Sequence, residues 1–306
     1  MAVLGIDIGG TKIAAGIVEP GGRLHSARVT PTRAAEGYEV SIAQIYGAID
    51  ALMGSGIQAI GISSPGPLNP KTGVVLNPPN LHGWRDVPLA RLVEQKYQLK
   101  CRVENDANAA GLAEALLGAG RGCSSVFYVT LSTGIGAGII LDGKIYHGKN
   151  GAAAEGGHVT IDYWNGPLCH CGSRGCIESV ASGTAMTERA RLLLGEYPAS
   201  AIAAGPLNAE TIGRAAAAGD ALGIHILDET AEMLGAWLGS IISLLDPDVI
   251  VIGGGVSQIG DPLFARLRRI APARTINPFA GDTPIVPAEL GMNAGIIGAA
   301  AVVDGI

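Results

Sequence analysis

The sequence is poor in aromatic residues, which make up only 4% of its 306 residues. It also lacks an apolar stretch of about 18 residues free of charge, the length that a membrane-spanning helix requires. Its net charge is −6, without long runs of one sign, so the sequence offers no basic patch for nucleic acid or for an anionic membrane. We therefore expect neither a stacking platform for bases nor a nucleic-acid or membrane partner.

The start of the chain has no pattern of a cleavable export signal. Residues 1–18 are apolar but are interrupted by Asp7 and Lys12, and no small-residue cleavage site follows them. The five cysteines are an odd number, and three of them lie close together, which favours a metal site over disulfides. We therefore expect a cytoplasmic protein in which Cys101 and Cys123 are ordinary small core residues.

The hydrophobic pattern predicts two successive series of strands and helices. The first series opens with strands at 3–8, 12–18 and 23–31. The second opens with strands at 125–131 and 135–141, followed by an Asp-Gly hairpin. Since each series begins with an apolar strand, a Gly/Thr turn and a returning strand, the pattern predicts a duplicated α/β architecture of two domains.

The boundary between the two domains is expected near residues 118–122, where the run GAGRG breaks a helical pattern. This run also fits a loop within one domain. With the boundary placed there, residues 1–118 form a small domain completed by the C-terminal helix 294–306, and residues 119–293 form a larger one. The other expected elements are helices at 38–53, 89–97, 108–117, 184–194, 220–245 and 294–303, and strands at 57–63, 101–104, 144–146 and 249–252.

Three glycine-rich turns follow apolar strands. They are Asp7-Ile8-Gly9-Gly10-Thr11-Lys12, Ser132-Thr133-Gly134-Ile135-Gly136-Ala137-Gly138 and Gly253-Gly254-Gly255-Val256-Ser257. Glycine lets backbone N–H groups approach a phosphate, Thr11 and Lys12 add donors, and Asp7 can hold Mg²⁺. Each turn alone also fits a tight hairpin. Together they indicate a nucleotide site, because ligands of α/β folds gather at the carboxyl ends of strands, although no Walker A or G-x-G-x-x-G pattern is present.

The segment Glu104-Asn105-Asp106 lies where a strand is expected to end and a helix to begin. Either Asn105 or Asp106 fits the N-cap of that helix, a purely structural role. A carboxylate at this position also suits a general base, since the helix N-terminus favours its ionised form. The local sequence leaves both interpretations open.

A cluster of His and Cys residues forms a four-ligand set of the kind that structural zinc prefers. The set comprises His158, Cys169, Cys171 and Cys176. Gly172 and Gly175 permit the tight turn that would bring the last two cysteines together. His170 competes as a ligand, but its position between two cysteines points it away from the metal. Four protein ligands leave no open position, so the zinc is expected to be structural.

These motifs together resemble those of the bacterial ROK family of sugar kinases, and the resemblance covers almost the whole chain. The three turns are similar to the two phosphate motifs and the adenosine motif of the actin-like ATPase superfamily, and Glu104-Asn105-Asp106 to the catalytic motif of the family. Glu155-Gly156-Gly157-His158 and the C-x-C-G-x-x-G-C-x-E run are similar to its zinc signatures. The sequence departs from many glucokinases at Ser132, where they have glycine. The resemblance implies a duplicated actin-like (ribonuclease H-like) α/β fold with a cleft between two domains.

The resemblance also implies roles for individual residues. Asp106 would be the general base. The sugar would be bound by Asp106 and by Gly66, Asn80, Asn105, Glu155, His158 and Glu178. ATP and Mg²⁺ would be held by Asp7, Gly9, Gly10, Thr11, Lys12, Thr133, Gly134, Gly254 and Gly255. Zn²⁺ bound to His158, Cys169, Cys171 and Cys176 would fix the loop that carries the sugar-binding Glu and His residues. The turn-rich segments 63–68 and 77–81, which contain Gly66 and Asn80, also fit plain connectors.

The implied activity is ATP-dependent phosphorylation of the 6-hydroxyl of a hexose, with glucose as the first choice. An N-acetylmannosamine or N-acetylglucosamine kinase is the alternative, and the sequence does not decide between them. A fructokinase of this family spaces its metal ligands differently. A sugar-responsive repressor would need a helix-turn-helix segment before Asp7, and an actin-like assembly protein would have no use for the sugar-side residues. We expect sugar and ATP as partners and a homodimer or homotetramer as the assembly.

Overall fold

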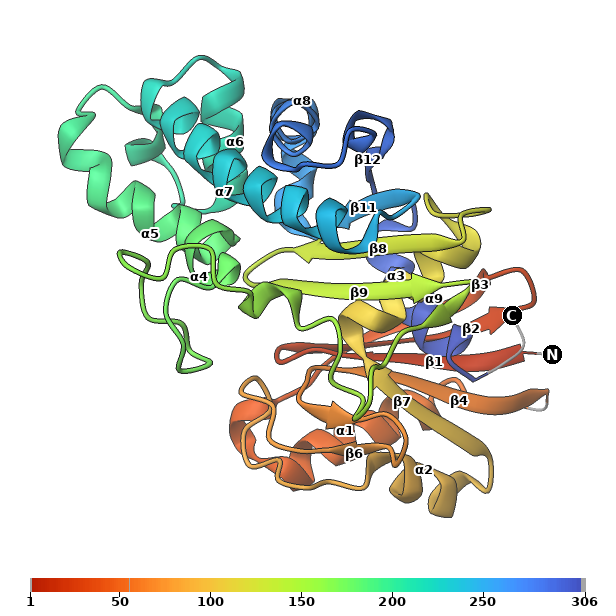
Figure 1. Ribbon diagram of the computed structural model, residues 1–306. Helices are drawn as coiled ribbons and strands as arrows, with labels where there is room; N and C mark the ends of the chain where they lie inside the picture. The colour runs from red at the N-terminus through yellow and green to blue at the C-terminus, as the bar shows by residue number, and fades with distance from the viewer. Residues whose placement is uncertain (1, 55, 304–306) are drawn as a thin grey trace. The chain divides into compact units, whose positions relative to one another are not determined.

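The computed structural model describes residues 2–54 and 56–303 (Figure 1). The chain divides into two compact units. The first comprises Met1–Gly122, Gly138–Ala154 and Glu289–Ile306, and the second comprises Cys123–Ala137 and Glu155–Ala288. Within the described ranges, no helix combines the length and the apolar character that crossing a bilayer demands.

The first unit is built on a five-stranded sheet with the order β3-β2-β1-β4-β7. Its strands are β1 (Ala2–Ile8), β2 (Lys12–Glu19), β3 (Arg23–Pro31), β4 (Ile57–Ser64) and β7 (Lys100–Asn105). β1, β2 and β3 pair antiparallel, whereas β1, β4 and β7 run parallel to one another. A short hairpin of β5 (Leu68–Asn69) and β6 (Val74–Val75) follows β4.

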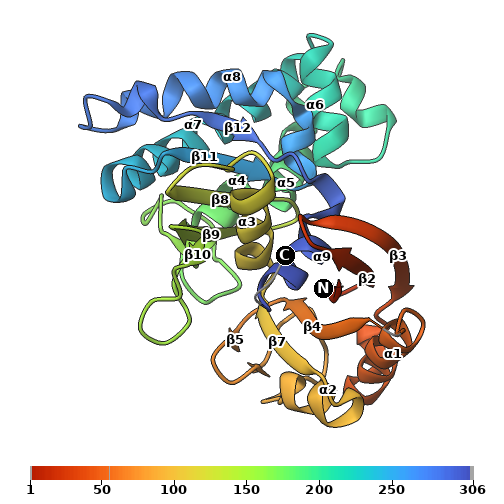
Figure 2. The ribbon, with the colours of Figure 1, turned by 90° about the vertical axis from the view of Figure 1, so that its right-hand side faces the viewer.

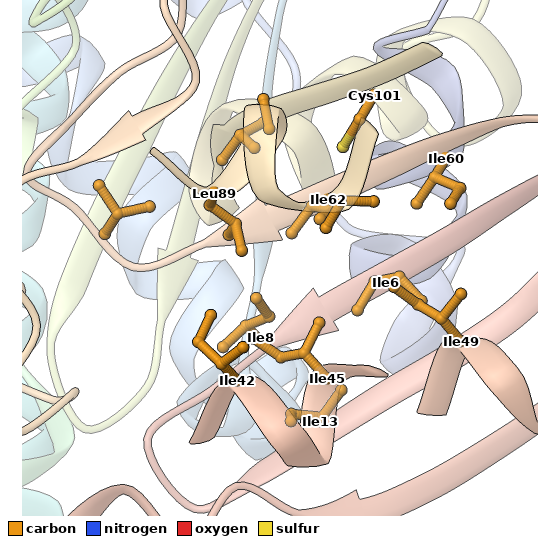
Figure 3. Packing of buried hydrophobic residues seen from close by; sticks show 14 of the residues in the cluster. Ile6, Ile8, Ile13, Ile42, Ile45, Ile49, Ile60, Ile62, Leu89 and Cys101 are labelled. Carbon is orange, nitrogen blue, oxygen red and sulfur yellow. The ribbon is translucent and has the colours of Figure 1, made fainter. Parts of the chain in front are cut away.

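Helices cover both faces of this sheet (Figure 2). α1 (Tyr38–Asp50) and α2 (Leu89–Tyr97) pack on one face, and α3 (Asp106–Leu117) and α9 (Ala294–Ala301) pack on the other. Because successive strand residues point to opposite faces, β1 contributes residues to the contacts with the helices on both faces of the sheet. Ile6 and Ile8 enter the core beneath α1 and α2 (Figure 3), whereas Gly5 lies against Ile296 of α9.

The second sheet has the strand order β10-β9-β8-β11-β12. Its strands are β8 (Ser125–Leu131), β9 (Ile135–Leu141), β10 (Lys144–Ile145), β11 (Val249–Gly253) and β12 (Ile285–Pro287). When the strands of each sheet are numbered in the order in which they occur along the chain, their spatial order in both sheets is 3-2-1-4-5. The duplicated α/β architecture expected from the sequence is therefore confirmed.

The helices of the second unit are α4 (Ile177–Ala181), α5 (Gly183–Leu193), α6 (Ala209–Ala217), α7 (Ala221–Leu245) and α8 (Asp261–Ile270). They include two, α5 and α6, whose first turns line its candidate site. Single 3₁₀ turns lie at Ala34–Glu36, Gly156–His158, Leu194–Glu196, Ala201–Ala204, Gly255–Ile259, Pro272–Arg274, Ala280–Asp282 and Gly291–Asn293.

Three expected helix boundaries need correction by two residues or more, and one of them is the end of the helix expected at 294–303, which ends at Ala301. The helix expected at 38–53 ends at Asp50, although Leu52 and Met53 still pack against the core. The helix expected to begin at Asn108 begins at Asp106, because Asn105 caps it. The sequence pattern also did not predict α4, α6, α8 or β12.

The carboxylate of Glu114 ties together three backbone segments of the first unit. Glu114 lies in α3 and is fully buried. Its Oε2 accepts the N–H groups of Ala119, at 3.0 Å, and Glu289, at 3.1 Å, and its Oε1 accepts the N–H of Leu290, at 2.8 Å. A single side chain thus satisfies three backbone donors, two of which join α3 to the segment before α9.

Replacing Glu114 by alanine should lower the free energy of unfolding by about 3 kcal/mol or more, because it leaves buried N–H groups without an acceptor. Urea unfolding of the variant and the wild type measures the effect. Glu188→Ala is the control, since within the described part of the chain this exposed carboxylate pairs only with Arg191 on the surface of α5, and the change should cost less than about 1 kcal/mol. Equal midpoints for the two variants would contradict the role given to Glu114.

Candidate active site

The candidate site of the first unit lies at the carboxyl edge of its three parallel strands. In the register of these strands, Asp7 of β1 pairs with Ser63 of β4, and Ser63 pairs with Glu104 of β7. One residue further along, Ser64 pairs with Asn105. The sheet therefore brings the first glycine turn and the Glu104-Asn105-Asp106 segment to the same edge, where α/β folds bind ligands.

Asp7 is held at this edge by two neighbours. Its Oδ1 accepts a hydrogen bond of 2.6 Å from the hydroxyl of Ser63. On the opposite side, Gly295 of α9 passes so close that a Cβ atom there would lie 2.5 Å from the carboxylate. Burial raises the pKa of the Asp7 carboxyl, while the Ser63 hydrogen bond and the charge of Lys12 lower it. A divalent cation bound to Asp7 would favour the ionised form of this carboxylate.

The turn between β1 and β2 contains the expected phosphate-binding residues. The N–H of Gly9 donates to the carbonyl of Lys12 at 2.8 Å, which closes the turn. Thr32 stabilises the turn through two hydrogen bonds. Its hydroxyl donates to the carbonyl of Gly9 at 2.6 Å, and its N–H donates to the carbonyl of Thr11 at 3.0 Å. Gly10 is left at the tip of a rigid turn.

The expected sugar-side residues of the first unit lie near this turn. A Cβ atom at Gly10 would lie 2.9 Å from the carbonyl oxygen of Asn80, so the phosphate turn and the Asn80 loop are direct neighbours. Gly66 follows the carboxyl end of β4 and precedes a cis peptide bond to Pro67. Both loops therefore lie at the same edge of the sheet as Asp7.

The structure assigns the N-cap of α3 to Asn105 and not to Asp106. Asn105 is the N-cap of α3, and its Oδ1 accepts the N–H groups of Ala107, at 2.9 Å, and Asn108, at 3.2 Å. Asp106 is the first helical residue, and its Oδ1 accepts the N–H of Ala107 at 2.8 Å. The helix therefore has its cap without Asp106, whose carboxylate lies at the positive end of the α3 dipole.

The second unit contains a cavity of about 370 Å³ between its glycine turns and the first turns of two helices. It is lined by Ser132, Thr133, Gly183, Thr184, Thr187, Asn208, Ala209, Glu210, Gly255 and Val256. Thr133 and Gly255 are thus placed together as expected, with Gly134 and Gly254 beside them in the chain. None of the described residues that line this cavity is Lys or Arg, so it suits a nucleoside rather than a polyphosphate chain.

Ser132, where the sequence departs from many relatives, keeps the second turn intact. Its N–H donates to the carbonyl of Gly134 at 2.9 Å, and its carbonyl accepts the N–H of Gly183, the first residue of α5, at 2.8 Å. The serine is therefore compatible with the turn, and it links the turn to α5.

The four expected metal ligands lie together in the second unit. Their donor atoms are all within 4.8 Å of one another. Sγ of Cys169 is 3.7 Å from Nδ1 of His158, and the Sγ atoms of Cys171 and Cys176 are 3.6 Å apart. In a tetrahedral site with Zn–S bonds of about 2.3 Å and a Zn–N bond of about 2.0 Å, neighbouring ligand atoms lie about 3.5–3.8 Å apart. The donor set therefore fits zinc.

Backbone geometry shapes this cluster. Gly175 has a φ of +67°, and a Cβ atom there would lie 1.7 Å from the carbonyl oxygen of Asp162. The N–H of Gly172 donates to the carbonyl of Cys169 at 2.9 Å, which closes the turn. Burial raises the pKa of the Cys176 thiol to about 12, so a metal ion would have to displace its proton.

The expected sugar-side residues of the second unit adjoin the metal cluster. Glu178 lies in the first turn of α4, two residues after Cys176. Its Oε2 accepts the N–H of Ile135 at 2.9 Å. Its Oε1 is buried and, within the described residues, makes no hydrogen bond, although Nε2 of His170 lies 3.2 Å away. Glu155 is exposed and begins the turn that ends at His158.

Several residues of these sites were not expected from the sequence. Thr184, Thr187 and Glu210 line the cavity of the second unit, and Ser63 holds Asp7. The helices that carry the cavity residues begin after polar caps, at Ser182 and Asn208, and this capping pattern could have located them. The pairing of Ser63 with Asp7 has no local signal, because 56 positions separate the two residues.

Comparison with known proteins gives consistent results. The model of the ROK family matches residues 3–306. The chain is 35% identical to a glucokinase from Thermotoga maritima, covering 99% of this chain and 97% of that protein. It is 31% identical to an N-acetylmannosamine kinase from Shigella boydii, covering 100% and 99% of the two chains.

The structural comparison agrees with these sequence matches. A crystal structure of a ROK family glucokinase from Streptomyces griseus, in complex with glucose and AMPPNP, is similar with a TM-score of 0.86 and 37% identity. The match covers 99% of each chain. The expected actin-like fold class is therefore confirmed.

Proposed function

Because the chain belongs to the ROK family, we propose that it transfers the γ-phosphate of ATP to the 6-hydroxyl of glucose. The observation that carries this proposal is the register of the parallel strands β1, β4 and β7, whose carboxyl ends bring Asp7, the glycine turn and Asp106 to one edge of the sheet. Phosphoryl transfer depends mostly on positioning and charge stabilisation, and this edge offers a metal-binding carboxylate, phosphate-binding N–H groups and a base.

In the proposed mechanism, Asp106 accepts the proton of the sugar hydroxyl as that oxygen attacks the γ-phosphorus of ATP. The bond from the γ-phosphorus to the β,γ-bridging oxygen breaks, and ADP leaves. The α3 N-terminus favours the ionised carboxylate that this step requires. Asn105 would orient the sugar beside the reacting hydroxyl, and Gly66 and Asn80 would form further sugar contacts. Glu155, His158 and Glu178 are the proposed sugar-binding residues of the second unit, and the buried Oε1 of Glu178 is an acceptor suited to a hydroxyl.

The nucleotide would be bound by both glycine-turn regions. Gly9, Gly10, Thr11 and Lys12 are assigned to the phosphates, and Asp7 to Mg²⁺, which supplies charge neutralisation when bound. Thr133, Gly134, Gly254 and Gly255 are assigned to the nucleoside side, supported by the cavity of about 370 Å³ that Thr133 and Gly255 line.

We also propose that His158, Cys169, Cys171 and Cys176 hold a structural Zn²⁺. Nδ1 of His158 is the ring nitrogen that faces Cys169, so Nε2 is the nitrogen available for a sugar hydroxyl. The proposed enzyme is cytoplasmic and assembles as a homodimer or homotetramer, two expectations that rest on the sequence.

A coupled ADP-release assay with glucose, mannose, fructose, N-acetylglucosamine and N-acetylmannosamine tests the substrate. We expect glucose to give the highest kcat/KM. The 31% identity to an N-acetylmannosamine kinase supports a second candidate, which a higher kcat/KM for N-acetylmannosamine would favour. No turnover of any of the five sugars would contradict the proposed activity.

A further inference from the structure

A buried carboxylate lies directly before the proposed base. Residues alternate along β7, so Cys101 and Val103 enter the core beneath α1 and α2, and Glu104 points to the opposite face, toward α3. Glu104 is buried. Its Oε1 accepts the N–H of Asn105 at 2.9 Å and the side-chain Nδ2 of Asn108 at 3.1 Å. One carboxylate oxygen therefore holds the backbone N–H just before Asp106 and the side chain of Asn108 just after it.

The other oxygen of Glu104 has a partner from a distant part of the chain. Nε2 of His147 lies 2.6 Å from Oε2 of Glu104. His147 follows β10 and belongs to the first unit. The proposed mechanism gives no role to either residue, and neither belongs to the expected sugar, nucleotide or zinc groups.

The pair is in contact with solvent. Glu104 and His147 line a cavity of about 220 Å³, together with Pro70, Lys71, Arg102, Val103 and Val302. The side chain of His147 is 34% exposed, whereas that of Glu104 is only 5% exposed. The imidazole can therefore exchange its proton with water, while the carboxylate depends on protein partners.

We propose that His147 is a positioning residue for catalysis: it anchors Glu104, which fixes the first turn of α3 and thereby the orientation of the Asp106 carboxylate. The inference rests on the proposed role of Asp106 as base. Glu104 cannot easily lose its partner, because a buried carboxylate without compensating contacts is costly. Without His147, the carboxylate is expected to rotate toward the cavity and to release Asn105 and Asn108.

The charge state of His147 gives this arrangement a pH dependence. The hydrogen bond to Glu104 raises the pKa of His147, while its partial burial and the charge of Lys71 lower it. Among the described residues that line the cavity, Arg102 is the other cation and Glu104 is the only carboxylate. A raised pKa means that the protonated imidazole is the form stabilised by the fold. The strong pairing is complete below the ordinary His pKa of about 6.5 and is lost as the pH rises through the raised value.

The test is the pH profile of kcat for the wild type and for His147→Gln with glucose and ATP. We expect the variant to lose about tenfold in kcat near neutral pH, with KM for glucose within about threefold, because Asn105 keeps its own capping hydrogen bonds. The wild-type decline of kcat with rising pH should be absent from the variant. His25→Gln, at an exposed position on the edge strand β3, is the control and should match the wild type.

A second variant keeps the test decisive if His147→Gln fails to fold. Glu104→Gln removes the charge that raises the pKa of His147 and should also flatten the profile. A profile of unchanged shape and height in the folded variants would overturn the inference. Failure of the proposed function would look different, since the wild type itself would then turn over none of the sugars.

Discussion

Replacing Asp106 by asparagine is expected to lower kcat by about 10²–10⁴-fold while leaving the affinity for glucose nearly unchanged. The amide cannot accept the proton of the sugar hydroxyl, so the general-base contribution is lost. Its oxygen can still accept the N–H of Ala107, as the Asp106 carboxylate does at 2.8 Å, so the start of α3 should be preserved. The capping role belongs to Asn105 and is untouched.

The measurement combines steady-state kinetics with calorimetric titration of glucose into the variant. Asp261→Asn is a matched control, because Asp261 is also the first residue of a helix, α8, and is exposed. The control should keep wild-type kcat and lose at most a few tenths of a kcal/mol of stability. If Asp106→Asn retained near-normal turnover, the carboxylate would be only a helix-terminal charge, and the base would have to be sought elsewhere.

The sequence predicted the duplicated fold because the signals for it are local. The strands of both series are apolar runs bounded by glycine turns, and the helix Leu89–Tyr97 was predicted with its observed bounds. The boundaries that failed are helix ends that the apolar spacing does not mark. The apolar spacing continues to Met53 after α1 has ended, and α3 begins at Asp106 because the cap is Asn105. The three residues of β12 are too few to carry a periodic pattern.

The candidate site was predictable to the extent that its residues are close in sequence. The His/Cys cluster is marked by the spacing of three cysteines within eight residues, and the proposed phosphate turn by consecutive glycines. Contacts between distant segments could not be predicted. The pairs of Ser63 with Asp7 and of His147 with Glu104 join residues separated by 56 and 43 positions, and only strand register and loop packing bring them together.

Loss of the proposed zinc is expected to have the second large effect. The protein purified without chelator should contain about one Zn per chain. Cys176→Ser should abolish this content, because the buried Sγ of Cys176 is one of the four donors proposed for the metal. Since Glu178 follows Cys176 by two residues and His158 is itself a proposed ligand, the sugar-binding side chains should lose their fixed positions. A displacement of about 1 Å in such groups can cost about 10²-fold, and we expect kcat/KM for glucose to fall by that order.

Cys123→Ser provides the matched control, because Cys123 is a free cysteine of the same unit that lies outside the cluster. It should keep wild-type zinc content, thermal stability and kcat/KM. Metal analysis, thermal unfolding and glucose kinetics on both variants separate a structural metal from an incidental cysteine group.

Metal uptake by protein stripped of zinc should also release protons, because burial holds the pKa of the Cys176 thiol near 12 and ligation requires the thiolate. Zinc-free protein with wild-type kcat/KM would show that the sugar-binding loop is held by the backbone alone, through turns such as the one that Gly172 closes on Cys169.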